Sequence, residues 1–104
     1  MFVAKVTGSV VATQKVDALV GAKLLVVEPY RIDPQGRRSL VSTGRTFVAV
    51  DSLGAGEGDL VLIAQGSSAR LTPETKNQPI DAVVIGIVDT MHTAGDCVYS
   101  REAS

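Results

Sequence analysis

The segment Phe47–Arg70 reads FVAVDSLGAGEGDLVLIAQGSSAR, and Pro79–Asp89 reads PIDAVVIGIVD. In the first segment two apolar runs flank a glycine-rich stretch, and glycine supplies the positive φ angles that tight connections between strands need. The second segment is apolar almost throughout, which is typical of a strand buried on both faces. Together they predict strands at Phe47–Asp51, Asp59–Gln65 and Ala82–Asp89.

The first half of the chain predicts two more strands. Phe2–Ala12 is rich in valine and alternates imperfectly, with Gly8 marking a bend or bulge. Lys23–Glu28 is a second apolar run, and Pro29 is expected to end it because proline cannot donate to a strand ladder. Arg38–Val41 could add a small hairpin arm.

Five short strands with almost no helical periodicity predict an all-β fold. We expect a small five-stranded OB-like β-barrel, because closing the sheet removes most exposed strand edges. A short helical turn is expected at Gly66–Leu71, and Leu19 and Val20 are expected to pack inward from a loop. We divide the chain into a β-barrel domain at residues 1–89 and a polar C-terminal tail at residues 90–104.

Composition points to assembly and away from nucleic acid or membrane. Apolar residues make up 45% of the 104-residue chain, a high share for a small soluble monomer, and this favours burial in an oligomer over a very apolar monomeric barrel. Ten basic and eleven acidic residues leave no basic excess for phosphate contacts. The sequence shows no secretory signal and no membrane-length apolar run, so we expect a cytoplasmic protein.

The glycines at Gly54, Gly56 and Gly58 invite comparison with a phosphate-binding loop. Their spacing does not match a dinucleotide fingerprint, and the Lys and Ser/Thr of a nucleoside-triphosphate loop are missing. We interpret them as structural turns. Gly86 is expected where its strand bends or approaches backbone closely.

The titratable residues predict no catalytic residue, no cofactor and no metal site. His92 is the only histidine and could bind metal only if a symmetry axis gathered several copies. Cys97 is the only cysteine, and no base for a nucleophilic thiol is identifiable near it. Aspartates at strand ends are more simply explained by bonds to local backbone than by acid–base chemistry. They are Asp51, Asp59, Asp81 and Asp89.

The most distinctive polar motif is Gly66, Ser67, Ser68, Ala69 and Arg70. It could simply cap the preceding strand. Alternatively, backbone N–H groups at the start of a short helix attract anions weakly, and five copies around an axis would line an opening. The motif is therefore a candidate for a subunit interface or a five-fold pore, and Asp81 could pair with Arg70 of the same or a neighbouring chain.

Most of the chain resembles one family, the pentameric vertex proteins of bacterial microcompartment shells (EutN/CcmL type). The resemblance rests on the order and spacing of several short matches. They are Gly8–Val10–Thr13–Lys15, Leu19–Gly21–Lys23–Leu24–Leu25 with Pro29, Val48–Asp51 with Gly54–Gly56, Gly66–Arg70, and Pro79–Ala82 with Gly86–Asp89.

This resemblance implies a structural protein and not an enzyme. It implies an OB-like barrel assembled as a homopentamer, placed at five-fold vertices of a shell in the bacterial cytoplasm. Its partners would be hexameric shell proteins, which form the flat facets of a carboxysome or metabolosome.

Two other functions stay open from the residues alone. An OB-type module could bind nucleic acid, and a cluster of arginines at Arg31, Arg37, Arg38 and Arg45 favours that alternative. The four aromatic residues are scattered, however, and give no stacking platform. An enzyme acting on a small molecule is third, since no acid, base and nucleophile set is identifiable.

Overall fold

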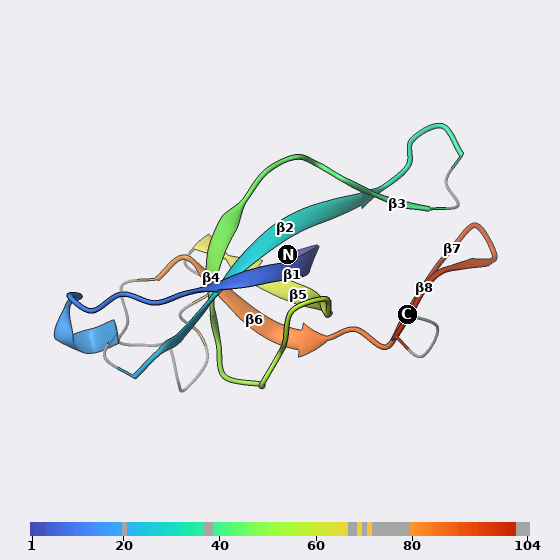
Figure 1. Ribbon diagram of the computed structural model, residues 1–104. Helices are drawn as coiled ribbons and strands as arrows, with labels where there is room; N and C mark the ends of the chain where they lie inside the picture. The colour runs from blue at the N-terminus through green and yellow to red at the C-terminus, as the bar shows by residue number, and fades with distance from the viewer. Residues whose placement is uncertain (20, 37–38, 67–68, 70, 72–79, 102–104) are drawn as a thin grey trace.

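A computed structural model of the chain contains eight strands and one 3-10 turn among the residues that it describes (Figure 1). It describes residues 1–101 except 20, 37–38, 67–68, 70 and 72–79. The elements are β1 (Phe2–Val10), η1 (Asp17–Leu19), β2 (Lys23–Ile32), β3 (Leu40–Ser42), β4 (Phe47–Asp51), β5 (Leu60–Gln65), β6 (Ala82–Ile87), β7 (Thr90–Thr93) and β8 (Asp96–Ser100).

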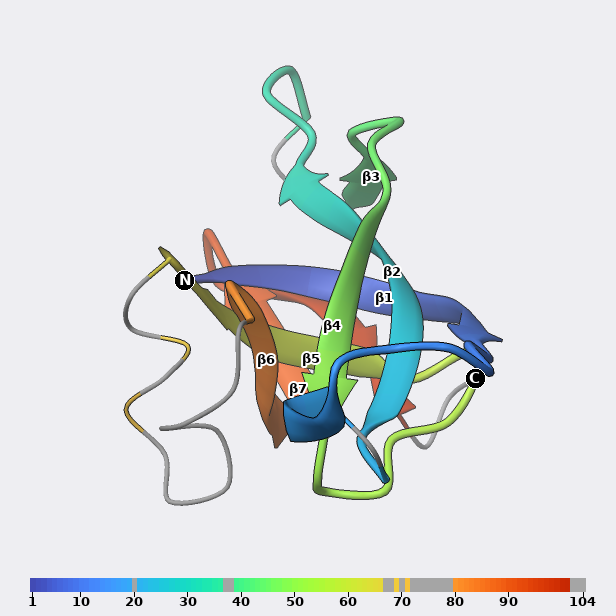
Figure 2. The ribbon, with the colours of Figure 1, turned by 90° about the vertical axis from the view of Figure 1, so that its left-hand side faces the viewer.

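Five of these strands close into a barrel, which confirms the predicted fold class. The sheet runs in the order β1-β5-β6-β4-β2, and an additional antiparallel pairing of β1 with β2 joins its two ends. This is a Greek-key order of the OB type. Figure 2 shows these strands curling around a shared interior. Four of the five junctions are antiparallel ladders, whereas β4 and β6 are parallel and share one pair, Val50 with Val83.

Side chains on two faces of the barrel wall form two apolar clusters. On β6, Ala82 and Val84 belong to the interior cluster, and Val83 between them belongs to the second cluster. Because successive side chains in a strand point to opposite faces, the second cluster lies on the outer side of the wall. Ala69, which is 0% exposed, covers it from the segment after β5. The first half of β6, Ala82–Val84, is therefore buried on both faces as its composition predicts, whereas Ile85 on the outer face is 37% exposed.

The prediction that Pro29 ends the second strand was wrong. Strand β2 continues to Ile32, and Pro29 pairs with Ala4 of β1. On its other side β2 pairs with β4 up to Val27 and with β3 from Tyr30 onward. Pro29 thus lies between two ladders, where its missing N–H is tolerated. The β2–β3 pairing forms the hairpin arm that was expected near Val41, and this arm projects from the barrel (Figure 2).

The expectation of a plain polar tail after the barrel was also wrong. Residues Thr90–Ser100 form an antiparallel hairpin, β7–β8, joined by Ala94 and Gly95. Both turn residues have positive φ, 51° and 81°, as a two-residue type I′ turn requires.

Three of the six residues in the predicted helical turn at Gly66–Leu71 lie outside the described residues, so this prediction is not tested. Val20, which was expected to pack inward, also lies outside them. The 3-10 turn that the structure describes is η1, and Leu19 at its end is half-buried.

Candidate functional site

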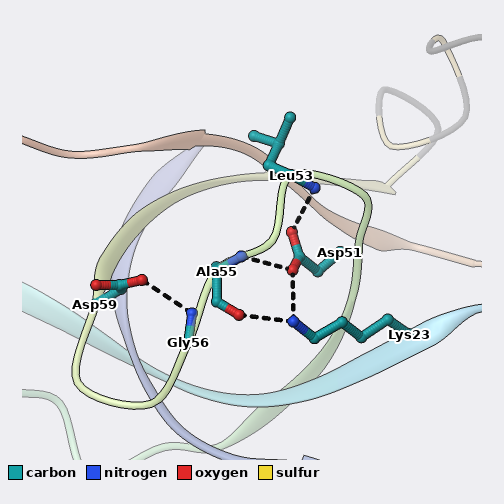
Figure 3. Close-up of polar contacts among 6 residues, drawn as sticks. All are labelled: Lys23, Asp51, Leu53, Ala55, Gly56 and Asp59. Carbon is teal, nitrogen blue, oxygen red and sulfur yellow. Dashed lines mark hydrogen bonds and ion pairs between the residues drawn. The ribbon is translucent and has the colours of Figure 1, made fainter.

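The connection between β4 and β5, Ser52–Asp59, is held by the buried carboxylate of Asp51 (Figure 3). One carboxylate oxygen accepts the N–H of Leu53 at 2.9 Å, and the other accepts the N–H of Ala55 at 2.8 Å. Lys23 Nζ lies 3.4 Å from the second oxygen and donates to the carbonyl of Ala55 at 2.8 Å. All of these groups are used within the chain, so Asp51 organises a loop and has no substrate-facing oxygen.

A second carboxylate fixes the other end of the same loop. Asp59 Oδ2 accepts the N–H of Gly56 at 2.9 Å (Figure 3). The N–H of Gly58 donates to the carbonyl of Val6, and Val6 N–H donates to the carbonyl of Asp59. Gly54 and Gly58 have φ of 85° and 94°, which L residues adopt only with strain, whereas Gly56 does not have positive φ. The loop is held on the barrel and leaves Leu53 half-exposed.

Two of the five residues of the predicted interface motif are described. Gly66 has φ of 67°, and its N–H donates to the carbonyl of Asp81 at 2.7 Å. The Ala69 side chain lies in the outer apolar cluster of its own subunit. Ser67, Ser68 and Arg70 lie outside the described residues, as does the proposed pairing of Arg70 with Asp81. A role at an interface or pore stays a prediction.

Gly86 lies directly opposite Leu62, next to a shift in the β5–β6 register. A Cβ atom at Gly86 would lie 3.4 Å from Leu62 Cδ1 and would meet no backbone atom within 4 Å among its nearest neighbours. The neighbour at this position is therefore a flexible side chain.

The C-terminal hairpin brings together two residues that the sequence analysis treated separately. His92 and Cys97 are register partners across β7–β8, and both are exposed. The expectation that no base lies near Cys97 was therefore incomplete, because Ala94–Gly95 is not a typical sequence for a two-residue hairpin turn and gives no signal that pairs the two residues. The Cys97 thiol donates to the carbonyl of Tyr99 at 3.1 Å. An exposed pair on a two-stranded hairpin has no enclosed cleft in which to bind a substrate.

Two of the aromatic residues that a nucleic-acid module would need are partly buried. The rings of Phe2 and Phe47 lie 5.6 Å apart and pack against the interior cluster. The guanidinium of Arg45 covers Phe47 at 5.1 Å. These two rings do not form a free stacking surface for bases.

The described part of the chain contains no cluster of three or more potential metal ligands. Among those same residues, no helix combines the length and the apolar character that crossing a membrane requires.

Comparison with known proteins identifies the family. The family model described as "Ethanolamine utilisation protein EutN/carboxysome" matches residues 1–89. The chain belongs to the EutN/CcmL family. The bacterial microcompartment shell vertex protein PduN of Salmonella typhimurium is 50% identical over 91 residues, which is 88% of this chain and 98% of PduN.

Solved structures of EutN/CcmL proteins share the fold as well as the sequence. Gloeobacter violaceus CcmL has a TM-score of 0.85 and 37% identity, covering 98% of this chain and 99% of that one. GrpN from Rhodospirillum rubrum, described as a pentameric microcompartment shell protein, has a TM-score of 0.74 and 44% identity, covering 90% and 99%. These matches confirm the resemblance seen in the sequence and support the shell vertex function over the nucleic-acid alternative.

Proposed function

We propose that five copies of this chain form a ring that occupies the five-fold vertices of a microcompartment shell in the bacterial cytoplasm. The observation that carries this proposal is the near-complete match to microcompartment shell proteins, two of which are described as pentameric. Hexamers tile a flat sheet, and closing that sheet needs five-fold positions. The contribution of this protein is therefore geometric.

The described residues fit a structural role better than a catalytic one. The barrel interior is filled by apolar side chains. The one buried charged group, as far as the described residues go, is Asp51, and its oxygens are engaged by two backbone N–H groups and Lys23. The same assignment keeps residues 1–89 as the barrel unit and residues 90–104 as an appended segment.

The proposal also covers the partner proteins of this chain and the place of the Gly66–Arg70 motif in the pentamer. The partners are hexameric shell proteins, whose contacts can each be modest because many of them act together in one shell. Gly66–Arg70 lies at the subunit interface or the five-fold axis. Arginine suits such a position because its planar fork makes bidentate contacts that lysine copies poorly.

The vertex role is tested by co-expression with compatible hexameric shell proteins, with and without this chain. Electron microscopy should show closed particles only when the chain is present, and a substoichiometric amount should suffice. Equal numbers of sealed particles in both samples would contradict the vertex assignment. The purified protein should show a pentameric mass by native mass spectrometry, and only monomer or dimer at micromolar concentration would contradict the ring.

The role of Arg70 is tested separately. Arg70→Ala should weaken the pentamer and leave the barrel folded, as judged by native mass and circular dichroism, while Arg70→Lys should restore assembly only in part. A variant that stays pentameric with unchanged thermal stability would place Arg70 outside the interface.

A further inference from the structure

The C-terminal hairpin lies outside the part of the chain that the family shares. The family match ends at residue 89, and the hairpin begins at Thr90. GrpN, described as pentameric, is covered over 99% of its length by 90% of this chain. Five-fold assembly in this family therefore does not depend on the hairpin, and a surface that the hairpin builds can serve a partner outside the ring.

The hairpin and the β2–β3 arm lie at the same end of the molecule (Figure 1), and an open cleft of about 280 Å³ lies between them and the barrel. Its apolar lining comes from Tyr30 and Leu40 on the arm, Leu60 on the barrel, and Val98 and Tyr99 on the hairpin. Leu60 is buried, whereas the other four are half-buried. Protein interfaces are close-packed, so an open cleft with this lining is typical of a docking surface.

A bulge in β8 brings two consecutive residues to this cleft. Met91 pairs with Tyr99 and His92 pairs with Cys97, which leaves Val98 as an extra residue in the described β7–β8 ladder. Consecutive side chains of a regular strand point to opposite faces, and a bulge re-aims them locally. Val98 and Tyr99 both line the cleft. The irregularity of the hairpin therefore enlarges the apolar surface of the cleft.

The polar side chains of the lining include three hydrogen-bond donors. Lys5 of β1 carries an ammonium group, and Tyr30 and Tyr99 each carry a phenol hydroxyl. Within the part of the chain that the structure describes, none of these three side chains makes a hydrogen bond or an ion pair. A tyrosine hydroxyl in a buried position usually has a partner. An ammonium and two phenols together offer hydrogen bonds to a carboxylate.

The carboxylates beside this lining are already bound inside the chain. Glu28 is the register partner of Lys5, but its carboxylate accepts the hydroxyl of Ser42. Asp59 accepts the N–H of Gly56 and lies beside Nε of Arg101. Lys5 is the one charged residue of the described cleft lining. The cleft therefore complements a negative charge on what it binds.

The form of the cleft favours a segment of a protein over a small molecule. A small ligand is normally enclosed over most of its surface, whereas this cleft is open to solvent. Among the described strands, β3 pairs with β2 alone and forms the edge of the sheet. The N–H of Asp33 donates to the carbonyl of Ser39, so by alternation the backbone groups of Leu40 and Ser42 point away from β2. An extended segment lying along β3 can bond to them.

We infer that this cleft binds an extended segment of another protein in which aliphatic residues alternate with acidic ones. The aliphatic side chains pack against Leu40, Leu60 and Val98, and an acidic side chain meets Lys5. The backbone of the segment pairs with the free edge of β3. This docking function goes beyond the geometric role proposed above.

The test uses the full-length protein and a synthetic peptide of about six residues, the length of an ordinary strand. Valine and glutamate alternate in the peptide, its ends are acetylated and amidated, and a fluorophore reports binding by anisotropy. One matched peptide carries glutamine in place of glutamate, and another carries serine in place of valine. Native mass spectrometry and circular dichroism of every protein sample report its assembly and its fold.

The wild-type protein should bind the valine–glutamate peptide saturably, with a dissociation constant of about 100 μM or tighter. Each matched peptide should bind about fivefold more weakly, because it lacks either the charge or the apolar side chains. Binding of the first peptide should weaken as salt is raised, since salt screens the attraction to Lys5. Hydrogen exchange at the backbone N–H groups of Leu40 and Ser42 should slow when this peptide is bound.

Substitutions in the cleft should change the affinity in opposite directions. Leu40→Asp and Val98→Asp should each weaken binding by about tenfold or more, because each adds a carboxylate to an apolar wall. Cys97→Asp, at the neighbouring exposed position outside the lining, is the matched control and should bind as wild type does. Lys5→Gln should weaken binding about threefold, and Glu28→Gln should strengthen it by removing the carboxylate opposite Lys5. If an aspartate variant disturbs the fold, Leu40→Ser and Val98→Ser take its place.

The absence of saturable binding to wild type up to about 1 mM peptide would overturn the inference. Equal affinity for the glutamine peptide would overturn the acidic character of the partner. Unchanged affinity in Leu40→Asp and Val98→Asp would place the peptide elsewhere on the protein and overturn the cleft. Loss of the assembled mass in these two variants, with assembly intact in Cys97→Asp, would assign the cleft to a neighbouring copy of the chain and would also overturn the inference.

Discussion

The Asp51 carboxylate offers the sharpest test of what holds the β4–β5 loop on the barrel. Its side chain is 0% exposed, whereas that of Lys23 is 51% exposed. Hydrogen bonds to a charged group contribute about 1.5–3 kcal/mol each, and Asp51 accepts two from backbone N–H groups. The half-exposed ion pair adds at most about 1 kcal/mol because water screens it. These contributions sum to about 3–7 kcal/mol, and removing one partner of a buried charged pair costs about 3–5 kcal/mol, so Asp51→Ala should lower the free energy of unfolding by about 3–5 kcal/mol, the lower part of that sum.

Two further variants at this site separate the contributions of its bonds. Asp51→Asn keeps one acceptor oxygen and replaces the other by an NH2 group, which cannot accept the backbone N–H that faces it. The free energy of unfolding should therefore fall by about half as much as in Asp51→Ala. Lys23→Met keeps most of the aliphatic stem, loses the ion pair and the bond to the Ala55 carbonyl, and should cost about 1 kcal/mol. The expected order of destabilisation is Asp51→Ala, then Asp51→Asn, then Lys23→Met.

The measurement is urea-induced unfolding at one fixed protomer concentration, because assembly adds stability that depends on concentration. Native mass spectrometry of the same samples shows whether each variant is still assembled. An Asp51→Ala protein within about 1 kcal/mol of wild type would refute the argument that this carboxylate holds the loop. A Lys23→Met variant less stable than Asp51→Ala would show that the ion pair matters more than the backbone bonds.

Three other substitutions test backbone geometry by thermal or urea unfolding. Gly58→Ala should cost about 1–2 kcal/mol because of its positive φ, whereas Gly56→Ala in the same loop should be nearly neutral; equal costs would contradict this reasoning. Gly86→Ala should also be nearly neutral, because a Cβ atom fits against Leu62. Gly86→Val should lower the free energy of unfolding by about 1–3 kcal/mol through overpacking. An unchanged Gly86→Val protein would show that the space beside Gly86 is larger than we infer. Ala94→Asn should stabilise the hairpin by up to about 1 kcal/mol, because asparagine tolerates positive φ better than alanine; greater hydrogen exchange in the hairpin would contradict it.

The barrel could be predicted because its strands carry strong local signals. Glycines at Gly54 and Gly58 separate two apolar runs, and the run in β6 is apolar on both faces because the wall has a cluster on each side. The end of β2 could not be predicted from Pro29. Proline ends a strand only where the neighbouring strand needs a hydrogen bond from its N–H. Strand β2 changes its neighbour from β4 to β3 near Pro29, and this change follows from the whole fold and not from the local sequence.

The C-terminal hairpin was missed for a different reason. Its strands are short and mostly polar, and its turn is Ala94–Gly95 where a typical sequence would have Asn-Gly. Without a buried face in its own subunit it has no strong alternation for a sequence to show. The carboxylate contacts of Asp51 and Asp59 follow the expectation that strand-end aspartates bond local backbone. The participation of Lys23, which is distant in sequence, needed the structure.

Strands β4 and β6 share only one pair, Val50 with Val83, so their pairing has fewer backbone contacts than any other strand pairing in the barrel wall. Every other junction must lose several ladder pairs before it opens, whereas this one has a single pair and depends on the apolar cluster that Ala69 covers from outside. If the wall is forced open, we therefore expect it to part first between β4 and β6, because each of the other four strand pairings holds several ladder pairs.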